Sequence, residues 1–155
     1  MDGLLTLAAI GDIHVSDTHD VRYRDLFAEI SDKADVLALC GDLTNLGKPR
    51  EAEMLAEDLK ACSIPIVAVL GNHDYECGSP EEVVRILCQA GVKFLGEDSH
   101  VIDGVGFAGV KGFAGGFGKF MLGAFGEETI KSFVQESTAE AMRLENALHI
   151  LDSER

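Results

Sequence analysis

Three short apolar runs, each stopped by a glycine and followed by polar side chains, constrain the fold of this chain more than any other feature. The runs are LLTLAAI (4–10), ADVLALC (34–40) and IPIVAVL (64–70), and the tetrapeptides that follow them are GDIH (11–14), GDLT (41–44) and GNHD (71–74). Short apolar runs bounded by such turns are typical of buried β-strands. The sequence therefore predicts buried strands over residues 4–10, 35–40 and 64–70.

Helical patterns separate the predicted strands. Residues 21–33, 50–62 and 80–90 carry apolar side chains at helical spacing, and Pro49 and Pro80 suit the starts of helices. Strands that alternate with helices predict an α/β fold with a mostly parallel sheet. In such sheets ligands bind beyond the carboxyl ends of the strands. All three polar turns fall at those ends, so we expect them to form one site.

The second half of the chain has a different character. Residues 93–95 and 100–110 predict short strands separated by tight turns, and residues 104–126 are rich in glycine and phenylalanine. Residues 127–151 carry an apolar stripe that predicts a long helix. A linker that would mark a second domain is missing, so we expect residues 1–155 to form a single domain.

Composition and charge exclude several classes of function. The chain has 155 residues, 46% of them hydrophobic, which is typical of a globular domain. Its formal net charge of −14 argues against general binding of nucleic acids or anionic membranes, whereas a small phosphorylated substrate is compatible with a metal site. The sequence contains no CxxC pair, signal sequence or membrane-spanning run, so we expect a cytoplasmic protein. We expect Cys40, which ends the second apolar run, to be a small core residue.

The polar turns offer oxygen and nitrogen ligands for metals. Asp12 and His14 lie two residues apart, and in extended backbone such side chains point the same way. Asp42 adds a carboxylate, and Asn72 and His73 add an amide and a second imidazole. Mixed ligands of this kind suit divalent Mn, Fe, Zn or Ni. Two such ions about 3.5–4 Å apart would clamp a phosphoryl group and activate a water. Each turn alone is ordinary turn chemistry, but three in this order favour a functional site.

GDIH, GDLT and GNHD resemble, in order and spacing, the first three sequence blocks of the calcineurin-like metallophosphoesterase family. The resemblance covers about the first half of the chain. It implies an α/β/β/α four-layer sandwich, here incomplete: the βαβαβ half, the start of a second sheet and a long C-terminal helix. It also implies hydrolysis of phosphomonoesters or phosphodiesters at a site with two divalent metal ions.

The same resemblance assigns roles to individual residues. Asp12 and His14 would hold the first metal, Asp42 would bridge both ions, and Asn72 would hold the second. His73 would contact the substrate phosphate or protonate the leaving oxygen. Asp74 would orient His73.

The chain departs from the family pattern after GNHD. The family continues with a single histidine after a later strand and then a GHxH block, which supply further metal ligands. Here only His100, in a turn expected to be solvated, and His149, on the predicted C-terminal helix, follow. The second metal would then have only Asp42 and Asn72 from the protein, so we expect this chain alone to carry an incomplete site with little or no activity.

Two interpretations of this departure stay open. The chain is a metallophosphoesterase truncated at its C-terminus, in which case a strand ending in histidine and a GHxH block follow Arg155. Alternatively, it is a shortened, non-catalytic metal-binding or scaffold protein of the same fold, which binds one metal at most. We favour the first interpretation.

Three further side chains are candidates for contact with a substrate. Lys111 and Lys119, in the glycine-rich segment, could reach a phosphate as point charges or could simply be solvated. His19 follows His14 on the same loop and could approach the substrate or belong to a polar surface loop.

Overall fold

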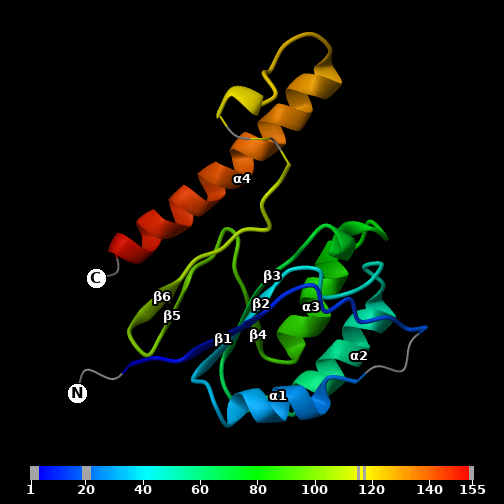
Figure 1. Ribbon diagram of the computed structural model, residues 1–155, viewed down its shortest axis with the longest axis vertical. Coiled ribbons are helices and arrows are strands. Elements are labelled where there is room, and N and C mark those ends of the chain that lie inside the picture. Colours follow the sequence, from blue (N-terminus) through cyan, green and yellow to red (C-terminus); the bar gives the residue numbers. More distant parts are fainter. Residues whose placement is uncertain (1–3, 19–21, 115, 117, 154–155) are drawn as a thin grey trace.

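A four-stranded parallel sheet forms the centre of the computed structural model, which describes residues 4–18, 22–114, 116 and 118–153 (Figure 1). The strands lie in sequence order: β1 (Leu7–Ile10), β2 (Val36–Cys40), β3 (Ile66–Val69) and β4 (Val92–Phe94). Ile10 pairs with Leu39, and Leu39 pairs with Ala68. This register brings the three polar turns out at the same edge of the sheet and confirms the predicted parallel arrangement.

Three helices connect the strands and lie together on one side of the sheet (Figure 1). They are α1 (Arg24–Ser31), α2 (Pro49–Leu59) and α3 (Pro80–Gln89), so the predicted alternation of strands and helices is confirmed. Phe27, Leu55 and Leu87 are fully buried in one apolar cluster with residues of the sheet. Burial of side chains of this size stabilises the fold by roughly 1.5–3 kcal/mol each.

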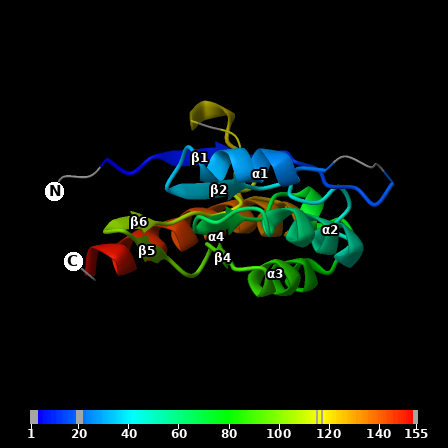
Figure 2. The ribbon, with the colours of Figure 1, turned by 90° about the horizontal axis from the view of Figure 1, so that it is seen from below.

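A hairpin packs on the other face of the sheet, and a long helix lies beyond the hairpin (Figure 1). The hairpin pairs β5 (His100–Ile102) with β6 (Val105–Phe107), and the helix is α4 (Glu128–Ser153). Ile102 packs with Val36 and Val67 in a second, smaller apolar cluster. The end of α4 lies against the hairpin, because a Cβ on Gly106 would stand 3.0 Å from the Leu151 side chain. The predicted order of helices, sheet, second sheet and helix is confirmed, and the third and fourth layers consist here of one hairpin and one helix (Figure 1). Figure 2 looks along this stacking direction from the side of α1, so α4 lies behind the sheet in that view.

Two expectations about burial are wrong. β1 is exposed or half-buried along its whole length, and Leu7 is 49% exposed, because β1 is the edge strand of the sheet. Cys40 is exposed rather than a core residue, since it stands at the end of β2 where a cavity opens beside the polar turns.

None of the helices in the described ranges combines the length and the apolar character that crossing a bilayer requires.

Candidate metal centre

Backbone hydrogen bonds hold the first two polar turns side by side. The amide of Asp12 donates to the Gly41 carbonyl at 3.1 Å, and the amide of His14 donates to the Asp42 carbonyl at 2.9 Å. Val15 and Thr44 then form an isolated parallel bridge. The pairing of β1 with β2 thus continues past the strands, which places GDIH directly beside GDLT.

Three of the predicted site residues have left-handed backbone conformations. The φ angles are 54° at Asp12, 49° at His14 and 50° at Asp42. Such angles are uncommon outside glycine, although Asp and His tolerate them better than most residues. Each costs of order 1–3 kcal/mol and persists only where the surrounding structure enforces it, which is typical of functional sites. The paired turns supply that enforcement here.

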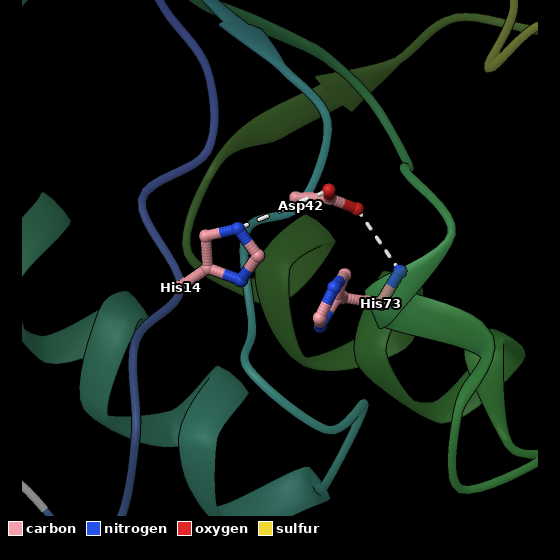
Figure 3. Close-up of side chains that lie close together, drawn as sticks. All are labelled: His14, Asp42 and His73. Carbon is pink, nitrogen blue, oxygen red and sulfur yellow. Dashed lines mark hydrogen bonds and ion pairs between the residues drawn. The ribbon is translucent and has the colours of Figure 1, made fainter.

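The side chains of the three turns converge on one point (Figure 3). The Nε2 atom of His14 lies 3.9 Å from Asp12 Oδ1 and 3.9 Å from Asp42 Oδ2. The rings of His14 and His73 meet edge to face with centroids 4.4 Å apart. Ligand atoms of His14, Asp42 and His73 all lie within 4.8 Å of one another. Parallel strands therefore bring together residues almost 60 positions apart in sequence.

This donor set fits a divalent ion. Two donors that each lie about 2.0–2.2 Å from a shared ion are separated by at most about 4.4 Å, and both His14 to carboxylate distances fall inside that limit. Imidazole and carboxylate together suit Mn, Fe, Zn or Ni. The Asp42 side chain is 15% exposed and that of Asp12 is 83% exposed, so the cluster opens to solvent on the Asp12 side.

The ring of His73 is oriented by a backbone group of the second turn. His73 Nδ1 lies 2.8 Å from the Asn45 carbonyl oxygen, which can only accept, so Nδ1 carries the proton and Nε2 is left for a ligand or a transferable proton. This hydrogen bond raises the pKa of His73, burial lowers it, and the Asp42 carboxylate raises it again, with a net rise above the usual value. The amide of His73 also donates to Asp42 Oδ1 at 2.9 Å.

Asp74 accepts hydrogen bonds from the second and third turns and not from the His73 ring. Its carboxylate is fully buried and accepts four hydrogen bonds, from the amides of Leu43, Thr44 and Gly71 and from the Thr44 hydroxyl, at 2.6–3.2 Å. In the part of the chain that the structure describes, Asn45, not Asp74, hydrogen-bonds the His73 ring. Asp74 therefore positions His73 through the loops.

Two glycines permit the close approach of the second and third turns. A Cβ on Gly71 would stand 2.2 Å from Asp42 Oδ1, and Gly41, with φ of 87°, lies against the backbone of Gly71. A side chain at Gly71 would displace the Asp42 carboxylate from the cluster, so this position requires glycine.

A cavity of about 740 Å³ opens beside the cluster and is lined by Asp12, Asp42 and Asn72. Asn72 thus faces the same space as the carboxylates. This cavity, which we call the site cavity, is also lined by Tyr75, Lys111, Phe113 and Glu136. Tyr75 directly follows the third turn, whereas Phe113 and Glu136 reach the cavity through long-range packing, of which sequence patterns gave no indication.

Two other histidines, His100 and His149, do not belong to the cluster. His100 is half-buried in β5 with Nε2 3.2 Å from the Phe94 carbonyl oxygen, so the expectation of a solvated turn is wrong. The side chain of His149 is 76% exposed on α4. His19 lies outside the described residues. Lys119 belongs to the short helix η2 (Gly118–Phe120), is exposed, and stacks over Phe120.

Comparison with solved structures finds a weak likeness to the carboxyl transferase domain from Rhizobium etli pyruvate carboxylase, solved with 3-hydroxypyruvate. The match has 23% sequence identity and a TM-score of 0.45, and covers 59% of this chain and 16% of that one. A likeness of this size carries no functional argument. No curated protein matches the chain.

The family comparison covers far more of the molecule. Residues 5–139 match the calcineurin-like phosphoesterases, a family of enzymes that typically bind metals. This range contains all three polar turns, the hairpin and the first half of α4. The chain belongs to the calcineurin-like phosphoesterase family.

Proposed function

We propose that this protein hydrolyses small phosphomonoesters or phosphodiesters with the help of two divalent ions, Mn, Fe, Zn or Ni. The observation that carries the proposal is the convergence of His14, Asp42 and His73, from three separate turns, within 4.8 Å. Family membership over residues 5–139 supports the same chemistry. The formal net charge of −14 supports a small substrate rather than a nucleic acid or a membrane.

Each residue of the cluster has a distinct proposed task. Asp12 and His14 would hold one ion, Asn72 would hold the other, and Asp42 would contact both. When bound, such ions stabilise charge on phosphoryl oxygens and lower the pKa of a water. His73 would contact the phosphate or give a proton to the leaving oxygen through Nε2, since its Nδ1 proton is already donated to Asn45.

A non-catalytic, metal-binding role is the second candidate. Among the described residues, the second ion would have only Asp42 and Asn72 as protein ligands, and no further histidine lies in the cluster. Two oxygen ligands make a weak site for Zn or Ni. This candidate predicts a single metal and no turnover.

Substitution of the shared carboxylate tests the proposed hydrolase. We expect Asp42→Asn to lower turnover of a chromogenic phosphomonoester by more than about 100-fold, because loss of a residue that contacts the ions exceeds the effect of losing a supporting partner. Asp103→Asn is the matched control, since Asp103 is an exposed aspartate with the same left-handed backbone (φ 50°), on the hairpin turn. Retention of activity in Asp42→Asn would contradict the assignment.

Metal titration separates the two candidates. Calorimetry with Mn, Zn or Ni should show two sites for the hydrolase and one for the binding protein. We expect Asp42→Asn to weaken both sites and His14→Ala to weaken one. Absence of turnover by the folded, full-length protein with every metal, for both a monoester and a diester, would contradict the hydrolase.

A further inference from the structure

Lys111 brings a positive charge to a site otherwise rich in carboxylates. Its side chain is 18% exposed and lines the site cavity together with Asp12, Asp42 and Asn72. Among the described residues that line this cavity, Lys111 is the only cation. An anionic ester that enters meets Asp12, Asp42 and Glu136, so without bound metal the field in the cavity opposes it. A mobile cation on the cavity wall would reduce that opposition.

Several contacts hold Lys111 beside the metal cluster. Its Nζ lies 5.7 Å from the centroid of the Tyr75 ring and 5.0 Å from that of Phe113. Tyr75 ends the short helix η1 (His73–Tyr75), the same turn that carries His73. Nζ also donates to the Gly112 carbonyl at 3.2 Å. The aromatic rings therefore place the ammonium group next to the turn from which the proposed proton donor comes.

The ion pairs of Lys111 are arranged so that Lys111 can leave them. Nζ lies 3.1 Å from Glu140 and 3.7 Å from Glu136. Arg143 contacts both glutamates as well and hydrogen-bonds Glu140. The Glu140 side chain is only 7% exposed, and a buried carboxylate without a partner is costly. Because Arg143 remains, the glutamates keep a cation when Lys111 turns away.

We propose that Lys111 binds an anionic oxygen of the phosphoester substrate in the site cavity, exchanging Glu136 and Glu140 for the phosphate. This inference rests on the proposed function. Lys111 acts as a point charge on a flexible stem, which suits transient capture of phosphate, whereas Arg143 holds the glutamates in place. Lys111 thus positions the substrate.

Paired substitutions test the proposal. Lys111→Met and Arg143→Met each remove one cation that pairs with Glu136 and Glu140. Of these two cations, only Lys111 lines the site cavity. We expect Lys111→Met to weaken binding of inorganic phosphate to the Mn-loaded protein about tenfold in calorimetry, which is typical of losing a charged hydrogen bond. Arg143→Met should change it less than twofold, and Lys111→Arg should restore most of the affinity.

Kinetics give a second readout. Lys111→Met should raise the KM for p-nitrophenyl phosphate more than it lowers kcat, because ground-state binding of the phosphate is what it loses. A purely structural role predicts equal phosphate affinity for the two Met variants together with a lower melting temperature, and that result would overturn the proposal, as would a wild-type protein that binds no phosphate. If the wild type binds phosphate but turns over no ester, the hydrolase proposal fails while the comparison of variants still decides the role of Lys111.

Discussion

The two halves of this chain are stabilised differently. Up to Phe94, strands and helices share a dense core in which Phe27, Leu37 and Leu55 are fully buried. After Phe94, the buried apolar side chains among the described residues are Ile102 and Ala147. In the same region Phe120, Phe125 and Met142 are 57–78% exposed. The first half therefore carries most of the hydrophobic stabilisation, and the second half relies on the hairpin and on ion pairs.

This difference corresponds to the two sides of the site. A metal site requires side chains fixed within a fraction of an ångström, and the strained backbone of the candidate site at Asp12, His14 and Asp42 lies on the well-packed half. The second half contributes Lys111 and Glu136 to the lining of the site cavity, and these two side chains form an ion pair. The candidate metal centre thus lies on the densely packed half, and the charged pair that lines the same cavity lies on the sparsely packed half.

Asp74→Ala is expected to produce the largest loss of stability. Removing this buried carboxylate leaves the amides of Leu43, Thr44 and Gly71 without their acceptor, and the free energy of unfolding should fall by at least about 3 kcal/mol. Urea denaturation measures the change, with the exposed Asp98→Ala as the control. A loss below about 1 kcal/mol would mean that the loops of the first half are held by other contacts.

Leu55→Ala tests the core of the first half directly. Leu55 is fully buried on α2, so its truncation leaves a cavity and should lower the free energy of unfolding by about 2–5 kcal/mol. The changes in the free energy of unfolding measured by thermal and by urea denaturation should agree if the fold unfolds in one step. A much smaller loss would imply that α2 repacks easily, which would weaken the contrast between the halves.

Sequence patterns predicted the elements of the first half because their physics is local. An apolar run before a glycine predicts a strand. Parallel pairing then places the three turns at the carboxyl ends of neighbouring strands, so Asp12, His14 and Asp42 converge as expected. The exposure of β1 was not predictable in the same way. The run at 4–10 resembles the buried run at 64–70, and only the order of strands decides which of them lies at the edge.

Contacts that act through the backbone or across long distances escaped sequence analysis. The acceptor that orients His73 is the carbonyl of Asn45, and any residue type could supply a carbonyl there. The buried role of Asp74 depends on amides of the second turn and of its own turn. The ion pairs of Lys111 depend on where α4 docks, which no periodicity specifies.

Asp58 offers a smaller, pH-dependent test within the first half. Burial raises the pKa of Asp58, but hydrogen bonds from Arg22 at 2.5–2.8 Å and from the Tyr23 amide at 2.8 Å together lower it by more, so the net change is a decrease. A lowered folded-state pKa contributes stability above the unfolded-state pKa of about 3.9, and this stability is lost as the pH falls through the folded-state value. We expect Asp58→Asn to lower the free energy of unfolding by about 1–3 kcal/mol near neutral pH. The difference from wild type should shrink below about pH 4, and a constant difference would contradict the ionic contribution.

Leu148→Ala is expected to have the smallest effect and to test the comparison most sharply. Leu148 is 53% exposed on α4, so truncation removes little buried surface and leaves no closed cavity. The free energy of unfolding should change by no more than about 0.5 kcal/mol, since alanine also favours the helix. Leu55→Ala is the matched substitution, with the same change of side chain at a buried helical position. If the two substitutions lower the free energy of unfolding equally, the exposed face of α4 is covered in solution, and the second half is packed as tightly as the first.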